Sequence, residues 1–441
     1  MTRTVSGSPL VCKFGGTSVA DAAQLQKVIS IVRSDPRRKY VVVSAPGKRY
    51  AADRKITDLL YLCYHTAQEG VDTSPVFKVI RDRFEELGRD LNVPAIGGWL
   101  DEVEAALADG VTRDWIASRG EYLHARLVAS HLGARFVDAA ECLRFTPDGR
   151  LDPITYSLMA DALAGSDLSV ISGFYGSDAD GRVKTFPRGG SDISGAVVAR
   201  AVGAAAYENW TDVDGLLMAD PRVVESPRLI REVTYKELRE LSYMGATVLH
   251  DEAVFPVREA GIPILLRNTN APETGGTWIV SSRAETELPI VGVAGRIGFS
   301  TIYVEKSMMN QELGFGVRVL EVLERYGISF EHVPTGIDSM SVVMRTEELG
   351  DHREAVMRDL QRVLEPDRLE LLEDMALIAT VGQGMSHRIG IASRLFVALA
   401  DAKVNIRMIN QGASEITIIV GVASSDYERA VQAIYSAFVT N

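Results

Sequence analysis

Two short segments join a charged side chain to two adjacent glycines, a pattern suited to binding an anion. The first is Lys13-Phe14-Gly15-Gly16-Thr17-Ser18, which lies between an apolar run and an amphipathic stretch. Adjacent glycines allow a backbone turn that points N–H groups at an anion, and the dipole of the following helix adds to the attraction. Lys13 would supply a full positive charge at the strand end. The sequence contains no GxxxxGK[ST] loop, so this is not a site of that type. A purely structural turn is the alternative.

The second segment is Phe186-Pro187-Arg188-Gly189-Gly190-Ser191-Asp192, which repeats this logic. Arg188 could clamp a substrate carboxylate in bidentate fashion, and the amides of Gly189 and Gly190 could hold phosphate. Asp192 could position a lysine or Mg2+, or it could simply cap the helix. Two such elements in one domain are much less likely to arise by chance than one, so together they favour a phosphate-handling site.

Two further segments carry polar groups at positions suited to substrate contacts. Ser118-Arg119-Gly120-Glu121 lies inside a helical stretch, where a glycine costs about 1 kcal/mol relative to alanine. The glycine could permit close approach of a ligand or another backbone, and Glu121 could then receive an ammonium group; a solvated Glu on a helix is the alternative. The run Trp210–Gly215, followed by Asp220-Pro221-Arg222, could hold a ribose or nucleobase, or be an ordinary turn.

Strand-like and helix-like segments alternate through the first two thirds of the chain. Alternation of this kind predicts an α/β sandwich with a mainly parallel central sheet, whose ligands bind at the carboxyl ends of strands. The segment 48–55 is basic and is expected to be a mobile loop. The expected strands are Leu10–Phe14, Tyr40–Ala45, Arg135–Val137, Ser169–Phe174, Ala206–Trp210 and Ile262–Arg267. The expected helices are Val19–Val32 with Thr17 or Ser18 as N-cap, Ile56–Gly70, Phe77–Leu91, Arg113–Leu132, Ser191–Val202, Thr234–Tyr243 and Asp251–Ala260.

An internal repeat organises the last third, where residues 301–344 align without a gap on residues 377–420. Each copy reads βαββα, and a final strand, Leu369–Glu373, is visible only in the first copy. Each copy is expected to contain two middle strands, Ile328–Val333 with Ser339–Met344, and Val404–Ile409 with Glu415–Val420. The expected helices are Phe315–Tyr326 and His352–Leu364, then Ile391–Ala402 and Asp426–Phe438. A split βαβ unit of this kind covers one sheet face with both helices. The repeat is therefore either a structural duplication or a ligand-sensing pair, and the predicted domains are residues 1–285, 286–376 and 377–441.

Composition excludes several classes of protein. The chain has 441 residues, 46% hydrophobic composition and a net charge of −12, which fit a globular protein and argue against a broad surface for nucleic acid or acidic lipid. No apolar run is long enough to span a membrane, and Met1–Leu10 lacks the pattern of a secretory signal. Cys12, Cys63 and Cys142 lie far apart and the His residues form no cluster with them, so we expect a cytoplasmic protein without a disulfide framework or structural zinc.

Taken together, these segments resemble the aspartate kinases of the amino-acid kinase superfamily. The resemblance rests on KFGGTS (13–18), SRGE (118–121), RGGSD (188–192) and TDVDG (211–215) with DPR (220–222), in matching order and spacing. The repeats look like the paired ACT regulatory domains of that family, which implies two ferredoxin-like domains after the kinase domain. The chain looks closest to monofunctional, lysine-sensitive members.

The resemblance implies a reaction: ATP as co-substrate, with Mg2+ bound through it, phosphorylates L-aspartate to 4-phospho-L-aspartate, the first step towards lysine, threonine and methionine. Lys13 would contact the transferring phosphoryl group, and Asp192 would organise the catalytic lysine. The other implied contacts are Gly15, Gly16, Gly189, Gly190, Thr211, Asp212 and Arg222 for ATP, and Ser44, Thr57, Glu121 and Arg188 for aspartate. A lysine frequent before Val-Leu-His in the family is Thr247 here, and a Tyr often near the adenine is Leu217.

The resemblance also implies feedback by lysine, threonine or both, bound between ACT domains of two chains. The matching candidates are Met309, Gly314, Phe315, Ser329 and Glu331, of which Glu331 could pair with an ammonium group. For Met309 and Phe315, plain core packing is the alternative. A homodimer or a dimer of dimers through the ACT domains is the expected assembly.

Two other functions remain open. One is a sister kinase acting on glutamate or acetylglutamate, which the SRGE element and the double repeat disfavour. The other is a catalytically silent amino-acid sensor, which the presence of Lys13, Arg188 and Asp192 disfavours. An assay of ADP release with a panel of acidic amino acids separates these possibilities.

Overall fold

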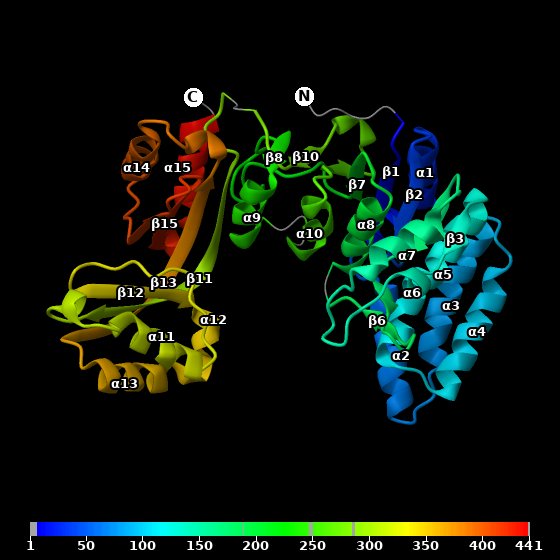
Figure 1. The fold of residues 1–441 in the computed structure, drawn as a ribbon, viewed down its shortest axis with the longest axis horizontal. Helices are drawn as coiled ribbons and strands as arrows, with labels where there is room; N and C mark the ends of the chain where they lie inside the picture. The colour runs from blue at the N-terminus through cyan, green and yellow to red at the C-terminus, as the bar shows by residue number, and fades with distance from the viewer. Residues whose placement is uncertain (1–6, 188, 247–248, 250, 285–286, 440–441) are drawn as a thin grey trace. The chain divides into compact units, whose positions relative to one another are not determined.

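A computed structural model describes residues 7–187, 189–246, 249, 251–284 and 287–439. Arg188 and Thr247, both named above, lie outside these residues. The chain divides into two compact units (Figure 1). The first comprises Met1–Leu216, Arg231–Tyr235 and Val248–Arg283, and the second comprises Leu217–Ile230, Lys236–Thr247 and Ala284–Asn441.

The first unit is built on a sheet whose strands follow the order β3-β4-β2-β1-β7-β9-β10-β8 in the described residues. All neighbouring strands pair in parallel except β9 and β10, which confirms the expected mainly parallel sheet. The strands are β1 (Leu10–Phe14), β2 (Arg38–Val43), β3 (Arg135–Val137), β4 (Ser169–Ser172), β7 (Ala206–Thr211), β8 (Glu232–Thr234), β9 (Ile264–Asn268) and β10 (Thr277–Val280).

Helices cover both faces of this sheet, and the side chains of β1 divide between them. Cys12 and Phe14 join a buried core with apolar residues of α1 to α5, whereas Lys13 points to the opposite face and reaches α8. This alternation follows from the two-residue repeat of a strand. The helices are α1 (Ala22–Arg33), α2 (Ile56–Gln68), α3 (Ser74–Asp90), α4 (Ile96–Asp109), α5 (Arg113–Leu132), α6 (Ala139–Cys142), α7 (Ile154–Leu163), α8 (Gly190–Ala201) and α10 (Asp251–Glu259).

The start of α1 differs from the prediction. Residues Gly16–Val19 form a 3-10 turn, and the helix begins only at Ala22, where the Asp21 carboxylate accepts a hydrogen bond from the Gln24 amide at 2.9 Å. Neither Thr17 nor Ser18 is the N-cap of α1. The tighter turn is closed by the Ser18 amide, which donates to the Gly15 carbonyl at 3.0 Å.

Several elements of the first unit were not predicted. Helix α4 contains Gly97 and Gly98, which lower helix propensity, and it is held by packing against α3 and α5. Helix α7 and the short strands β8 and β10 were also missed, as was the hairpin of β5 (Tyr175–Ser177) and β6 (Val183–Thr185). Strands of three or four residues are too short to show a clear alternating pattern.

The second unit contains an antiparallel sheet with the order β12-β11-β13-β15-β14 in its described part. Its strands are β11 (Gly292–Glu305), β12 (Ser339–Arg345), β13 (Arg368–Val381), β14 (Met408–Gln411) and β15 (Thr417–Ala423). Its helices include α9 (Tyr235–Tyr243), α11 (Phe315–Arg325), α12 (Thr346–Leu349), α13 (Arg353–Leu364), α14 (Ile391–Asp401) and α15 (Tyr427–Val439).

Two long strands run through both copies of the repeat. The second half of β11, Thr301–Glu305, pairs with Arg368–Leu372 of the first copy. The first half, Gly292–Ile297, pairs with Ala376–Val381 of the second copy. Gly292–Ile297, which precedes the first copy in the chain, is therefore the final strand that the sequence did not show in the second copy. The predicted domain boundaries had placed this stretch in residues 286–376.

One predicted strand in this region is wrong. Residues 328–333 form no strand in the structure and make only an isolated bridge between His332 and Val343. Likewise, the strand expected from Val404 begins only at Met408. Among the described residues, no helix is both long and apolar enough to cross a bilayer.

Candidate active site

Lys13 and Asp192 form the centre of the site. Lys13 is the fourth residue of β1 and lies beside Asn209 of β7 in the parallel register. Its Nζ is 2.5 Å from Oδ1 of Asp192, in the first turn of α8. Asn209 donates from Nδ2 to the same oxygen at 2.7 Å. The Lys13 side chain is 9% exposed and that of Asp192 17%, so the pair is shielded yet reachable.

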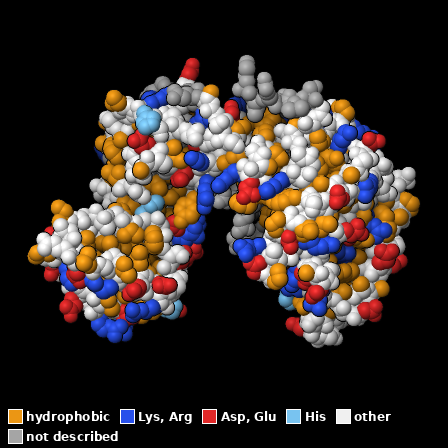
Figure 2. Space-filling model, in the orientation of Figure 1, with side chains coloured by type: hydrophobic (Ala, Val, Ile, Leu, Met, Phe, Trp, Pro, Cys, Tyr) orange, Lys and Arg blue, Asp and Glu red, His pale blue; other side chains and the backbone are white. Residues whose placement is uncertain are grey.

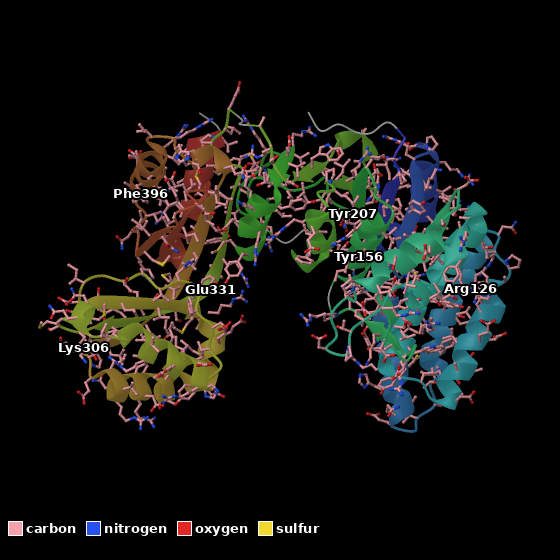
Figure 3. All side chains as sticks on the ribbon, viewed as in Figure 1. Arg126, Tyr156, Tyr207, Lys306, Glu331 and Phe396 are labelled. Carbon is pink, nitrogen blue, oxygen red and sulfur yellow. The ribbon has the colours of Figure 1, made fainter. Side chains whose placement is uncertain are left out.

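Tyr207 holds the backbone of the same turn. Its hydroxyl donates to the main-chain oxygen of Asp192 at 3.1 Å and accepts from Asn209 at 3.2 Å (Figure 3 labels Tyr207). A Cβ on Gly195 would lie 2.6 Å from the Tyr207 ring, so this glycine permits the contact. Neither Tyr207 nor Asn209 was predicted. The available signal was that Asn209 and Thr211 lie two apart and so share one face of a strand.

The first double-glycine turn is tied to two neighbouring strand ends. The Gly15 amide donates to the Trp210 carbonyl at 3.0 Å, and the Gly47 amide donates to the Gly16 carbonyl at 2.8 Å. The Gly15 amide therefore already has a hydrogen-bond partner. Of the two amides in this turn that were predicted to contact phosphate, that of Gly16 remains the candidate. A Cβ at Gly47 would lie 2.5 Å from the Gly16 carbonyl carbon, so the β2 loop needs a glycine there.

The second double-glycine turn begins α8. Gly189 is the N-cap and has φ of +58°, a left-handed conformation that favours glycine. Its carbonyl accepts from the Asp192 amide at 2.9 Å. A Cβ at Gly190 would lie 2.7 Å from the Phe174 ring and 2.9 Å from its Cα. Close packing therefore accounts for this pair of glycines at the same position where phosphate binding was predicted.

The end of β2 and the helices α2 and α5 pack closely against one another. A Cβ at Gly120 would lie 2.9 Å from the Ala45 Cβ and 3.2 Å from Ile56, so this glycine lets α5 approach both segments. Thr57, half-buried in the first turn of α2, and Ser44, directly before Ala45, lie in these segments. The segments that contain Ser44, Thr57 and Glu121 therefore pack against one another.

Glu121 is buried, and the solvated-surface interpretation of this residue is wrong. Burial raises the pKa of its carboxyl to about 8, although a hydrogen bond from the Ala45 backbone acts in the opposite direction. Its Oε2 has no hydrogen-bond partner in the part of the chain that the structure describes. Such an atom is suited to a donor on a ligand.

His124 lies one helical turn after Glu121 and was missed by the sequence reasoning. Its Nδ1 is 2.7 Å from the Ser44 carbonyl and therefore donates, which leaves Nε2 unprotonated. Burial lowers the pKa of the ring to about 4, so the imidazole is neutral at pH 7. His124 fixes the backbone of Ser44.

The buried Arg83 anchors the loop that follows β2. It donates to the carbonyls of Gly47 at 2.7 Å and Arg54 at 2.8 Å. Within the loop, Arg49 pairs with Asp53 at 2.9 Å. Both ends of the segment that was expected to be a mobile loop are thus held by Arg83 in this structure.

The predicted nucleotide contacts fall in both units. Thr211 donates from its hydroxyl to Asp212 at 3.1 Å, and its carbonyl accepts from the Thr269 amide at 2.9 Å. Asp212 is exposed at the carboxyl end of β7. Arg222 belongs to the second unit, where its side chain is 87% exposed and pairs with Asp220 at 2.6 Å.

The predicted effector residues lie in the second unit and differ in exposure: Met309 and Phe315 are buried, whereas Gly314 and Ser329 are exposed. Met309 and Phe315 are part of the buried core of the first repeat, which is the packing alternative stated above. Gly314 is the N-cap of α11, with φ of +76°. Glu331 pairs with Arg345 at 3.1 Å and accepts from the Tyr243 hydroxyl, so its charge is already balanced.

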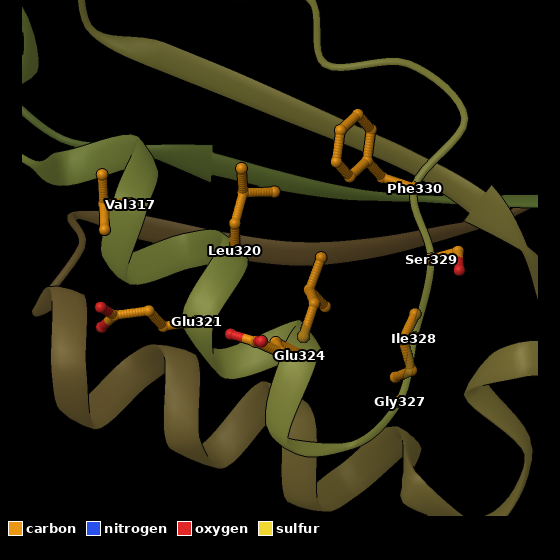
Figure 4. A pocket seen from close by; sticks show the side chains of 9 residues that line it. Val317, Leu320, Glu321, Glu324, Gly327, Ile328, Ser329 and Phe330 are labelled. Carbon is orange, nitrogen blue, oxygen red and sulfur yellow. The ribbon is translucent and has the colours of Figure 1, made fainter.

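Ser329 alone of this predicted set lines a cavity of about 750 Å3 beside α11. Figure 4 shows Val317, Leu320, Glu321 and Glu324 on the helix and Phe330 on the adjoining loop. The cavity is thus apolar, with two acidic side chains at its edge.

Comparison with known proteins identifies the family. Residues 8–268 match the amino acid kinase family, and residues 378–438 match the ACT domain. Aspartokinase 3 of Bacillus subtilis is 39% identical over 97% of this chain and 98% of its own length. The chain belongs to the aspartokinase branch of the amino acid kinase family. It is therefore an aspartate kinase, a phosphotransferase of amino-acid biosynthesis.

Solved aspartokinase structures agree with this assignment. The aspartate kinase of Clostridium acetobutylicum has a TM-score of 0.92 at 47% identity and covers 98% of this chain and 100% of its own. Escherichia coli aspartokinase III in complex with aspartate and ADP has a TM-score of 0.73 at 28% identity, with coverage of 98% and 100%. The mainly parallel sheet followed by antiparallel ACT-like repeats is thus the aspartokinase architecture.

Proposed function

We propose that the Lys13–Asp192 pair is the point of phosphoryl transfer and that the phosphates of ATP lie between the two double-glycine turns. The supporting observation is that one cation and one carboxylate meet at 2.5 Å where β1 ends and α8 begins. The positive end of α8 and the Gly16, Gly189 and Gly190 amides add donors beside them. Thr211 and Asp212 contact the rest of the nucleotide in this proposal.

Aspartate occupies the space between the β2 end and α5. Glu121 receives its ammonium group, Ser44 and Thr57 contact it through their hydroxyls, and Arg188 holds its α-carboxylate. E. coli aspartokinase III, which is described in complex with aspartate and ADP, supports aspartate as the ligand. The attacking β-carboxylate has an ordinary pKa of about 3.9 and is ionised at pH 7.

No general base is required, because the nucleophile already carries its negative charge. The barrier is repulsion between that anion and the phosphate chain, so the site acts by neutralising charge and aligning the two groups. Lys13 is the protein cation at the transferring group. Asn209 and Asp192 keep its Nζ in one position.

The residues present fit Mg2+ that arrives with ATP. This ion keeps several waters and binds through one or two carboxylates plus substrate phosphates. Asp192, in the first turn of α8, and Asp212, directly after β7, are the carboxylates that would hold it. When bound, the ion neutralises phosphate charge.

The test is ADP release with L-aspartate, L-glutamate and N-acetylglutamate. Aspartate alone should support turnover. Lys13→Ala should lower kcat at least about 100-fold, the scale for losing one key electrostatic contact. Arg188→Ala should instead raise the KM for aspartate strongly. Lys78→Ala, whose lysine is 71% exposed on α3, is the control and should leave both constants unchanged.

A near-normal kcat in Lys13→Ala would remove this residue from the mechanism, and an unchanged KM in Arg188→Ala would remove the carboxylate clamp. Preferred turnover of glutamate or N-acetylglutamate would point to the sister kinases. No turnover with any substrate would favour a silent sensor.

The ACT-like repeats bind lysine, threonine or both, and they join two chains. E. coli aspartokinase III, named lysine-sensitive, supports lysine as an effector, and its complex with lysine and aspartate is described as a T-state. Apolar side chains gather on the surface over α11 and β12 (Figure 2), including Val317 (59% exposed) and Phe330 (49% exposed). This face is the proposed contact in a homodimer or a dimer of dimers. Assays with saturating lysine and threonine test the regulation, and no change in rate or thermal stability would exclude it.

A further inference from the structure

A second cavity lies in the kinase unit, on the face of the sheet opposite the Lys13–Asp192 pair. It has a volume of about 540 Å3 and lies between α1 and the carboxyl ends of β7 and β9. Trp210 forms part of its wall, and its ring stacks on Phe14 at 5.9 Å. Because Asn209 reaches Asp192 on the other face, the adjacent Trp210 points away from the phosphoryl-transfer site.

The charged groups around this cavity are predominantly cationic. Lys27, Arg38 and Arg267 line it. The buried Glu208 contacts Arg38 and Arg267, and it accepts two hydrogen bonds from Arg38, of 2.8 and 3.1 Å. Asp35, which precedes Arg38 in the sequence, is hydrogen-bonded to Arg37.

Glu208 divides its two oxygens among several donors. It also accepts from Cys12 at 3.2 Å and from the Trp210 ring nitrogen at 3.1 Å. Arg267 stays 3.7 Å from it, stacked 4.4 Å above the Trp210 ring. Burial lowers the pKa of Arg267 despite the attraction of Glu208, as expected for a cation short of counter-charge.

Arg267 and Asn270 each bring a donor to the lining of the cavity. Arg267 Nε is buried and has no hydrogen-bond partner among the described residues. Lys27 is an exposed side chain whose Nζ donates to Asn270 Oδ1 at 2.7 Å, which leaves the Asn270 NH2 group as a further donor. The Ser30 and Ser34 hydroxyls donate to carbonyls of their own helix. A ligand that satisfies these donors must bring acceptors and negative charge.

We propose that this cavity binds a small anion with more than one negative charge, carrying carboxylate or phosphate groups, between Lys27, Arg267 and Asn270. The guanidinium fork and a lysine ammonium are the usual protein partners of both groups. The site is separate from the ATP phosphates, which lie on the other face of the sheet.

The walls of the cavity are hydrogen-bonded directly to the nucleotide segments. The Trp210 carbonyl accepts from the Gly15 amide at 3.0 Å. Thr269, which also lines the cavity, donates from its hydroxyl to Ser18 at 2.8 Å and from its amide to the Thr211 carbonyl at 2.9 Å. An anion that draws in Arg267 and Asn270 therefore acts on both the first double-glycine turn and the turn after β7. The affected constant is the KM for ATP.

The test is calorimetric titration of the whole chain with inorganic phosphate and, separately, with succinate. The kinase site is first filled with Mg2+ and a non-hydrolysable ATP analogue, so that heat reports only a second site. We expect one anion per chain. Lys27→Ala, an exposed position on a helix where alanine is well tolerated, should weaken binding roughly tenfold, as for loss of one charge-assisted hydrogen bond. Lys78→Ala is the matched control and should bind like the parent.

Binding of phosphate alone, of succinate alone or of both identifies the anion class and supports the site. No binding of either probe, or equal affinity in Lys27→Ala, overturns it. The anion that binds should also change the KM for ATP at least about twofold in the parent and not in Lys27→Ala, and an unchanged KM in the parent overturns the coupling. These outcomes do not depend on which amino acid accepts the phosphoryl group, because calorimetry reads the site without turnover.

Discussion

Two neutral titratable side chains lie on one turn of α5, where we propose that aspartate binds. Glu121 is buried, so burial raises the pKa of its carboxyl to about 8, and His124 is held neutral with its pKa lowered to about 4. Neither group therefore carries a charge in the free protein near pH 7. An arriving ammonium group changes this balance, because it favours the ionised carboxylate.

Binding of aspartate should consequently release a proton from Glu121. Below pH 8 the free carboxyl is protonated and must ionise to pair with the ammonium, so affinity for aspartate should rise with pH up to about 8 and then level off. Calorimetry in buffers of different ionisation enthalpy measures the released proton. Glu121→Gln should raise the KM for aspartate at least about tenfold and abolish the proton release. Proton release that persists in Glu121→Gln would assign it to another group.

Asn209 acts on the mechanism through Asp192. Its amide and the Lys13 ammonium share one carboxylate oxygen, at 2.7 and 2.5 Å, so the amide fixes the direction in which the carboxylate presents itself to the lysine. Without the amide, the carboxylate can rotate and draw Lys13 away from the phosphoryl group. Asn209 is a positioning residue in this view.

Asn209→Leu, of similar size but without the amide, should lower kcat about tenfold or more and leave the KM for aspartate within about twofold. Tyr207→Phe is the paired variant, because that hydroxyl contacts the main-chain oxygen of Asp192 and not its carboxylate. It should lower thermal stability with little change in kcat. Equal kcat losses in both variants would indicate a general packing defect.

At the scale of elements, close backbone contact holds the first double-glycine turn against the loop after β2. The Gly47 amide donates to the Gly16 carbonyl, and Arg83 ties the Gly47 carbonyl to α3. A side chain at position 47 would meet the backbone of Gly16 and Thr17, which cannot rotate away as a flexible side chain could. The loop after β2 therefore sets the position of the first double-glycine turn, where we propose that phosphate binds.

Gly47→Ala should lower the free energy of unfolding by about 1–3 kcal/mol, the usual cost of overpacking, and reduce kcat/KM for ATP. Chemical denaturation and steady-state kinetics measure the two effects. Gly98→Ala is the control: nothing lies within 4 Å of a Cβ there, and the position is helical. It should gain about 0.5–1 kcal/mol. A Gly47→Ala variant as stable and active as the parent would refute the contact.

Elements with long, regular patterns could be predicted from the sequence, and those decided by distant partners could not. β1, α5 and β7 were predicted to within one residue at each end, because their apolar spacing and flanking glycines are local signals. The start of α1 was wrong because Asp21, not Thr17 or Ser18, caps it. Segments that carry several predicted site residues pack together in the structure. Asn209 and His124 could not be predicted, because their roles depend on contacts with Asp192 and Ser44, which are distant in the sequence.

At the scale of the whole molecule, β11 and β13 make the two repeats one continuous sheet. Each strand spans 14 residues and gives one half to each copy, so neither copy is complete without the other's neighbouring segment. A shift in one copy is carried along these strands to the other, because paired strands keep their register. The repeats should therefore respond to an effector as one body.

The exposed apolar face of α11 is where a second chain should join this sheet. Val317→Asp places a charge on the face where Val317 is 59% exposed, and charges are depleted from the centres of protein interfaces because burying them is costly. We expect the dimer to dissociate at least about tenfold more readily by sedimentation equilibrium, with kcat within about twofold of the parent and loss of inhibition by lysine or threonine. Val79→Asp is the matched control, since Val79 is 46% exposed on α3 of the kinase unit, and it should leave assembly and inhibition unchanged. A Val317→Asp protein that remains dimeric would place the subunit contact elsewhere, and a monomer that is still inhibited would show that the effector needs only one chain.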